Sequence, residues 1–200
     1  MDNRGMFDEL IRMFQTGGMW LVPIAFCLVT AVVIAVERFM KLFMQYSVDG
    51  ASFMFEVQKH ILANDLDGAI RLCNGSERAM LPKVIKAGLQ RASRDEQQIQ
   101  NAIDATSLEV IPKMERRLSY LALIANIATL FGLLGTIAGL IKSFAAIANT
   151  LEPSKRQEIL SSGISEAMNA TAFGLVTAIF AMIAHSFLTN KSNRLIEDID

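Results

Sequence analysis

Three long apolar runs constrain this 200-residue chain more than any other feature of its sequence. They cover Met19–Val36, Tyr120–Ile141 and Ala167–Asn190, and none contains Asp, Glu, Lys or Arg. A helix needs about 20 predominantly apolar residues to cross a bilayer, and each run is close to that length. Since 52% of all residues are also hydrophobic, the sequence predicts an all-α integral membrane protein with three transmembrane helices.

The residues around these runs divide the chain further. Between the first two runs the apolar residues follow a helical spacing and show no strand pattern, which predicts a helical loop. We expect its last helix, from about Asp95, to continue into the second run. Before the first run, apolar residues share one helical face, as in a segment lying on a membrane, and the charges do not fit a cleaved signal peptide. The predicted segments are an amphipathic segment (1–17), the first transmembrane helix (18–40), the helical loop (41–117), the second transmembrane helix (118–148), a connection (149–162), the third transmembrane helix (163–190) and a tail (191–200).

The distribution of basic residues predicts the orientation. Twelve of the 19 Lys and Arg residues lie between Arg38 and Arg117, several of them next to the ends of the apolar runs. Cytoplasmic loops carry an excess of Lys and Arg, so the long loop should be cytoplasmic. With three crossings, the N-terminus then lies outside and the C-terminal tail inside.

Several classes of function find no support in the sequence. The two cysteines, Cys27 and Cys73, lie in different segments, and neither is near a histidine at metal-ligand spacing, so we expect no disulfide and no metal site. The loop contains no phosphate-binding or nucleophile motif, which argues against an enzyme and against a cofactor. A formal net charge of −1 gives no reason to expect nucleic-acid binding.

Hydroxyl side chains follow one line along the second run. Thr129, Thr136 and Ser143 are seven residues apart, which is close to two helical turns. Thr136 lies 18 residues before Ser154, the centre of the connection, and Thr171 in the third run lies 17 residues after it. The two threonines should therefore have the same depth in an antiparallel hairpin. Intramembrane threonines often bond only to their own helix, but the matching depth favours a narrow, partly hydrated path.

Small residues in both runs indicate close helix packing. Glycines spaced four apart allow two helix backbones to approach each other in lipid. The candidate packing residues are Gly132, Gly135, Gly139 and Gly174.

Two ionisable residues near the ends of the third run are further candidates for an ion path. Glu166 precedes the run at its external end, where it can either start the helix or collect cations. His185, near the other end, can titrate or pack as a neutral ring. Lys142 is most simply a snorkelling residue. Because no Asp or Glu lies inside any run, a proton path through the bilayer centre needs a carboxylate from a partner.

At these residues the sequence resembles the MotA/TolQ/ExbB proton-channel family, with the ExbB and TolQ branches the most similar. The resemblance is carried by Thr129–Phe144 (TLFGLLGTIAGLIKSF) and Gly163–Ile179 (GISEAMNATAFGLVTAI). It extends to Glu37–Arg38, to Asp65–Cys73 and to Leu81–Leu89.

The resemblance implies a homopentamer in a bacterial inner membrane, with the N-terminus and the connection periplasmic. The second and third helices would surround a pore that holds the single-span helices of an ExbD-, TolR- or MotB-like partner, which supplies a transmembrane Asp. Proton-motive force would then drive work on a TonB- or TolA-like or other envelope effector. Thr136, Thr171 and Glu166 match the polar pore positions of the family, and Thr129, Ser143 and His185 extend the candidate path.

Some alternatives remain open. Where ExbB and TolQ usually continue with Pro and then Tyr-Asn, this chain has Phe180 and His185–Ser186. Import, envelope maintenance and gliding therefore all remain possible roles, and sodium remains an alternative to protons. A non-conducting membrane scaffold is the main competing hypothesis. A transporter subunit or a membrane enzyme has no supporting residues in the membrane runs.

Overall fold

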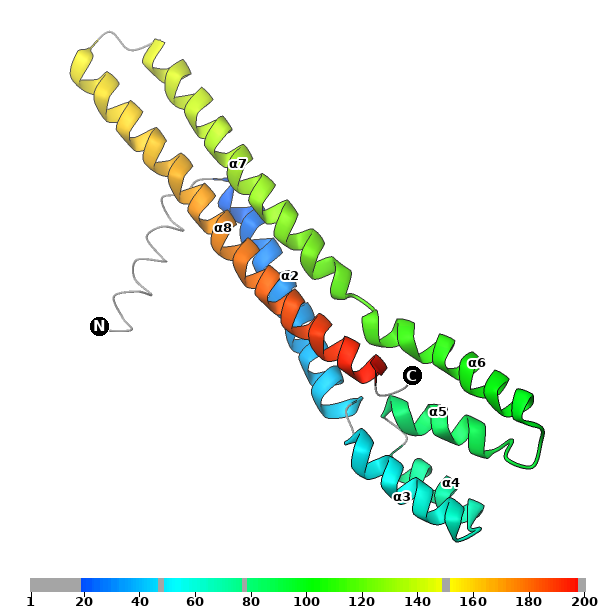
Figure 1. The fold of residues 1–200 in the computed structure, drawn as a ribbon. Coiled ribbons are helices and arrows are strands. Elements are labelled where there is room, and N and C mark those ends of the chain that lie inside the picture. Colours follow the sequence, from blue (N-terminus) through cyan, green and yellow to red (C-terminus); the bar gives the residue numbers. More distant parts are fainter. Residues whose placement is uncertain (1–18, 47–48, 77–78, 149–151, 198–200) are drawn as a thin grey trace, which may run out of the picture. The chain divides into compact units, whose positions relative to one another are not determined.

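The computed structural model describes residues 19–46, 49–76, 79–148 and 152–197, and its regular secondary structure there is entirely helical. Three stretches of helix, containing α2, α7 and α8, are long and apolar enough to cross a membrane. The prediction of an all-α protein with three candidate spans is thereby confirmed. The predicted amphipathic segment (1–17) lies outside the described residues. The elements are α2 (Leu21–Met40), a short π-helix (Lys41–Gln45), α3 (Gly50–Leu62), α4 (Leu66–Gly75), α5 (Met80–Leu89), α6 (Glu96–Glu115), α7 (Leu118–Ala148) and α8 (Pro153–Glu197) (Figure 1).

The chain forms two compact units. The first, which we call the membrane unit, comprises residues 1–35 and 120–185. The second, which we call the loop unit, comprises residues 36–119 and 186–200. Helices α2 and α8 each contribute to both units.

The membrane unit is built around a seam of small residues between α7 and α8, which run antiparallel and side by side (Figure 1). Ala128 on α7, and Ala170 and Ala181 on α8, are almost completely buried. Small side chains let the two backbones approach closely, and dispersion contacts then stabilise the pair in lipid.

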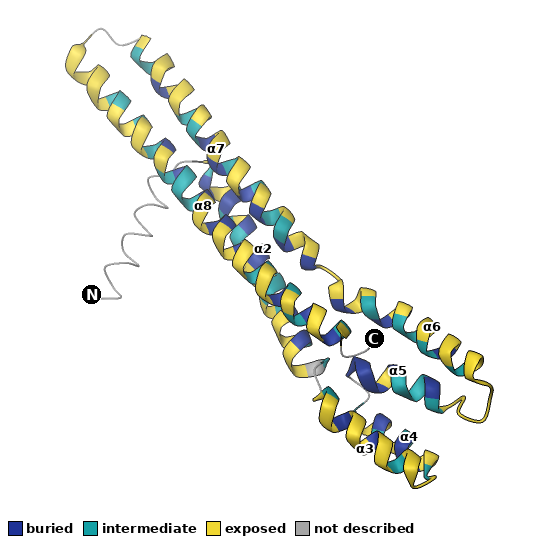
Figure 2. Ribbon diagram, in the orientation of Figure 1, coloured by how far each residue is buried: buried dark blue, intermediate teal, exposed yellow. Residues whose placement is uncertain are grey.

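The outward faces of the membrane unit are apolar and exposed (Figure 2). Phe26 on α2, Leu130 on α7 and Ile183 on α8 each leave more than 60% of their surface uncovered. Soluble proteins rarely expose contiguous apolar surface on this scale, so these faces fit contact with lipid or with other membrane helices.

The loop unit has its own hydrophobic core. Phe53 and Val57 on α3 pack with Cys73 on α4 and Leu81 on α5, and all four are at most 7% exposed. Leu72, Ile85 and Leu89 pack against this cluster. The apolar spacing that predicted helices in the loop therefore marks the faces that turn inward.

Asp65 caps the start of α4 and organises the tight connection from α3. Its carboxylate accepts a hydrogen bond from the backbone N–H of Gly68 at 2.9 Å and lies 3.1 Å from Nδ1 of His60. The bond from Gly68, with a smaller contribution from His60, lowers the pKa of Asp65. A side chain at Gly68 would collide with this carboxylate, since a Cβ atom there would lie 2.0 Å from an Asp65 oxygen.

We expect Cys73 to react slowly with alkylating reagents in the folded protein. Its side chain is 1% exposed, and burial raises the pKa of its thiol, so the reactive thiolate is scarce at neutral pH. Iodoacetamide at pH 8 should modify Cys73 at least about tenfold faster after denaturation in SDS, as followed by mass spectrometry. Equal rates in the folded and denatured protein would contradict the burial of this core.

The expected continuous helix from the loop into the second crossing is interrupted. Helix α6 ends at Glu115, and α7 begins at Leu118. Arg116 between them has an extended ψ of 131°, and Arg117 has a positive φ of 68°. Pro112 lies inside α6, and because proline has no N–H it weakens the last turn of that helix. This interruption separates the helical loop from the second candidate span.

Helix α8 is longer than the third apolar run. It begins at Pro153, so residues 153–162 of the expected connection are helical. Proline is well tolerated at the first position of a helix, where its missing N–H would have no partner anyway. Most of the predicted connection (149–162) is thus part of α8.

Candidate functional site

The glycines of α7 set the register of the α7–α8 hairpin. A Cβ atom at Gly132 would lie 3.2 Å from the Cα atom of Thr171, and one at Gly135 would lie 2.8 Å from the Cβ atom of Ala170. Thr171 therefore lies near the level of Gly132, and Ala170 near that of Gly135. Because successive residues of antiparallel helices move in opposite directions, Thr136 is displaced from Thr171 toward the connection by up to about one helical turn. The expected equal depth of the two threonines is therefore met only to within about one turn.

Thr171 bridges the two helices. Its hydroxyl donates a hydrogen bond of 2.9 Å to the backbone carbonyl of Gly132. The absence of a side chain at Gly132 brings that carbonyl within reach of α8. Thr171 is therefore a polar contact between α7 and α8 at a level where the neighbouring surface is apolar.

The other hydroxyls bond within their own helix. Thr129 donates to the carbonyl of Ala125 at 3.0 Å, Thr136 to that of Leu133 at 2.6 Å and Ser143 to that of Gly139 at 2.8 Å. Such bonds satisfy a hydroxyl in lipid without any partner helix.

The line formed by Thr129, Thr136 and Ser143 also winds around the axis of α7, so the three side chains differ in their exposure. Thr129 is exposed, Thr136 is half-buried and Ser143 is 4% exposed. Seven residues fall about 20° short of two full turns of an ideal helix. The line therefore moves progressively into the seam, and Ser143 lies against Gly163, where a Cβ atom would be only 1.6 Å from its Oγ.

Glu166 lies at one end of the α7–α8 hairpin beside a basic residue. Its carboxylate is 3.9 Å from Nζ of Lys142, and its side chain is 31% exposed. Both residues line a cleft of about 460 Å³ between the C-terminal end of α7 and the first part of α8. The same cleft contains Lys155 and Glu158, so opposite charges meet at this mouth of the hairpin.

The remaining candidate residues lie elsewhere on the two helices. His185 is half-buried near the boundary of the membrane unit, one full apolar run away from Glu166. Gly139 packs against Ala167, and Gly174 packs against the backbone of Ala128 and Gly132. Within the described residues no three His, Cys, Asp or Glu side chains cluster as metal ligands do.

Sequence reasoning did not single out several residues of the seam. Gly163 and Ala170 face α7 at close range, and Thr177 is fully buried with no hydrogen-bond partner for its hydroxyl among the described residues. The heptad spacing of Gly163, Ala170 and Thr177 was available in the sequence. The sequence alone does not show that this line of α8 faces α7, because that depends on how the two helices pack.

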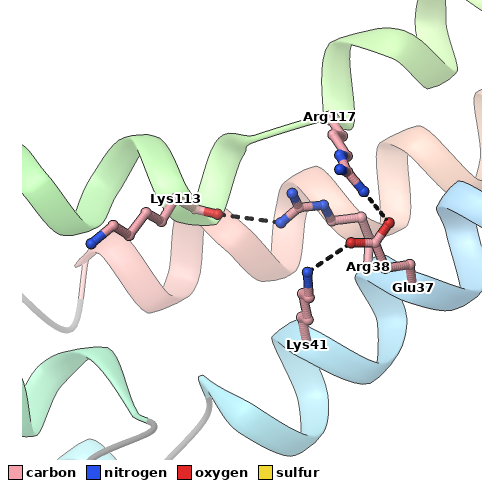
Figure 3. A network of polar contacts seen from close by, with 5 residues as sticks. All are labelled: Glu37, Arg38, Lys41, Lys113 and Arg117. Carbon is pink, nitrogen blue, oxygen red and sulfur yellow. Dashed lines mark hydrogen bonds and ion pairs between the residues drawn. The ribbon is translucent and has the colours of Figure 1, made fainter.

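The sequence did not predict which contacts the charged residues at the C-terminal end of α2 make. In the structure Arg38 is 1% exposed, and its guanidinium donates to the backbone carbonyl of Lys113 at 3.2 Å. The adjacent Glu37 binds both Lys41 and Arg117 (Figure 3). Of the two consecutive arginines just before the second run, Arg117 is the one that joins this charged cluster.

Part of this chain matches a known protein family. The family model described as the MotA/TolQ/ExbB proton channel family matches residues 76–200. The match includes α6, α7 and α8, and therefore every candidate residue of the α7–α8 hairpin.

Individual relatives agree with the family match. The chain is 25% identical over 194 residues to a putative biopolymer transport protein ExbB homolog of Methanothermobacter thermautotrophicus, covering 97% of this chain and 68% of that protein. It is 33% identical over 88 residues to the Tol-Pal system protein TolQ of Haemophilus influenzae, covering 44% and 38%. It is 38% identical over 78 residues to the biopolymer transport protein ExbB of Salmonella typhimurium, covering 39% and 31%. For the last two proteins the chain thus spans less than half of the relative's length.

Proposed function

Since the chain belongs to the MotA/TolQ/ExbB proton channel family, a family of channels rather than enzymes, we propose that it is the channel-forming stator subunit of an energy-transducing motor in a bacterial inner membrane. The motor couples proton-motive force to work on the cell envelope. Import through an outer-membrane receptor, Tol-type envelope maintenance and gliding are the candidate forms of that work.

The observation that carries this proposal is a polar path that lacks a carboxylate. The apolar stretches of α2, α7 and α8 contain no Asp or Glu in their interior, whereas proton transfer across a bilayer centre needs a titratable group. The hairpin nevertheless carries two threonines, Thr136 and Thr171, within about one helical turn of the same level. A second protein that inserts one acidic transmembrane helix beside these threonines completes the path.

We assign three positions along this path. Glu166, whose carboxylate lies 3.9 Å from Nζ of Lys142, collects protons at the external mouth. Thr136 and Thr171 contact the partner's acidic group near the middle. Thr129, Ser143 and His185 extend the path toward its two ends, and the glycines Gly132, Gly135, Gly139 and Gly174 keep α7 and α8 in contact.

The exposed apolar faces support assembly with further chains. Five copies, with α7 and α8 around a common pore, would enclose the single-span partner of the ExbD, TolR or MotB type. In this arrangement the N-terminus and the α7–α8 turn are periplasmic and the loop unit is cytoplasmic, in agreement with the excess of Lys and Arg in the loop. We expect the partner to pass force to an envelope effector of the TonB or TolA kind.

Native mass spectrometry tests the assembly directly. The full chain is co-expressed with the single-span protein encoded beside it and extracted from membranes in detergent. We expect a mass of five copies of this chain with a firmly held partner. A monomer or dimer that never retains the partner would overturn the pore proposal.

A non-conducting scaffold is the second candidate, because Thr129, Thr136 and Ser143 all bond within their own helix. A scaffold needs the small-residue seam and not the hydroxyls. The double variant Thr136→Val, Thr171→Val would then retain full function, whereas the channel proposal expects loss of ion flux with assembly unchanged.

A further inference from the structure

The break between α6 and α7 is fastened to the C-terminal end of α2 (Figure 3). Glu37 on α2 accepts hydrogen bonds from Lys41, at 2.7 Å, and from Arg117 at the break. The neighbouring Arg38 reaches the backbone carbonyl of Lys113 in the last turn of α6. Two consecutive residues of α2 thus contact the last turn of α6 and the break itself. All these groups belong to the loop unit.

Arg38 occupies an acceptor that a continuous helix would use internally. In an α-helix each backbone N–H donates to the carbonyl four residues earlier, so the carbonyl of Lys113 would accept from the N–H of Arg117. The extended ψ of 131° at Arg116 turns that N–H away from the axis of α6. The guanidinium of Arg38 lies 3.2 Å from the same carbonyl and replaces the missing donor.

Arg117 holds a backbone conformation that its side chain does not favour. Its φ of 68° lies in the left-handed region, which residues with a Cβ atom rarely adopt. Its side chain is anchored to Glu37. Strained residues of this kind persist where surrounding contacts fix them, and they often occur at switch regions.

The contacts at the break leave one hydrogen-bond donor of Arg38 without a partner among the described residues. Nε of Arg38 is buried and has no hydrogen-bond partner within the described residues. A buried donor without a partner is unfavourable, and so is a buried guanidinium. These costs oppose the contacts that Glu37 and Arg38 make at the break.

We propose that the α6–α7 junction is a two-state hinge controlled by Glu37 and Arg38. In the fastened state Arg38 binds the Lys113 carbonyl, and the two helices are separate. When α2 withdraws these two residues, the N–H of Arg117 takes the same carbonyl, and α6 and α7 join into one helix from Glu96 to Ala148. This inference does not depend on proton conduction.

A matched pair of variants at Arg117 tests the hinge. Arg117→Gly and Arg117→Ala both lose the ion pair with Glu37, but only glycine accepts a φ of 68° without strain. We expect the alanine variant to adopt the continuous helix and the glycine variant to keep the break. Hydrogen exchange of the full-length protein in lipid nanodiscs, read by mass spectrometry over residues 113–119, should be at least about tenfold slower in the alanine variant.

Two further variants examine the role of Arg38. Arg38→Leu removes the competing donor and should slow exchange of the same peptide, as Arg117→Ala does. Lys113→Ala should leave exchange unchanged, because Arg38 binds the backbone of Lys113 and not its side chain. Exchange in Arg117→Ala that equals or exceeds that in Arg117→Gly would overturn the hinge, even if Arg38→Leu fails to fold.

Discussion

Replacing Thr171 with valine is expected to abolish most of the ion flux while leaving the protein folded and assembled. Valine has nearly the shape of threonine but no hydroxyl, so the bond to the Gly132 carbonyl is lost. That carbonyl keeps its partner within α7, and the cost to stability should be only about 1 kcal/mol. If the hydroxyl contacts the transferred proton, the flux should fall at least about tenfold, equivalent to about 1.4 kcal/mol in the barrier.

The measurement is proton uptake by liposomes containing the complex with its single-span partner, driven by an imposed membrane potential. Thr171→Ser is the matched control, since serine restores the hydroxyl and should recover most of the flux. Native mass spectra of both variants verify equal assembly. Wild-type flux in an assembled Thr171→Val complex would remove Thr171 from the path and favour the scaffold.

The second large effect is expected at Gly174. A Cβ atom there would lie 2.8 Å from the carbonyl oxygen of Ala128 and 2.9 Å from the Cα atom of Gly132. Both are backbone atoms, so no side-chain rotation relieves the collision. Gly174→Val therefore forces α7 and α8 apart, at a cost of about 1–3 kcal/mol or more, and should abolish a monodisperse peak in size-exclusion chromatography in detergent.

Gly75 provides the control for this substitution. It also lies in a helix, but a Cβ atom there would meet nothing within 4 Å. Gly75→Ala should leave the elution profile unchanged and, through helix propensity, stabilise α4 by up to about 1 kcal/mol. If Gly174→Val elutes like Gly75→Ala, the seam does not hold the hairpin together.

The helical spans were predictable because their composition alone excludes most other structures. A run such as Tyr120–Ile141 has no charge to place in lipid, and a helix satisfies all of its backbone groups internally. The similar depth of Thr136 and Thr171, within about one helical turn, followed from counting residues along two antiparallel helices. These features depend on local sequence and on the fixed rise of a helix.

Features set by contacts distant in sequence were not predictable in the same way. Arg38, which contacts α6 just before the break at Arg116–Arg117, lies 75 residues before its acceptor at Lys113. Local sequence around Pro112 is compatible with a kinked but continuous helix. Similarly, the burial of Ser143 follows from the position of α8, whereas spacing alone placed Ser143 on one line with Thr129. The roles of these residues in ion transfer stay predictions until flux is measured.

Helix α8 has a mechanical consequence. Its 45 residues extend about 68 Å, roughly twice the thickness of a hydrocarbon core of about 30 Å. Pro153 at its first position is its only proline, and no helix break divides it, in contrast to the paired helices α6 and α7. Because no break divides α8, a tilt imposed at Glu166 would be transmitted through one continuous helix toward Lys191 rather than absorbed at a kink.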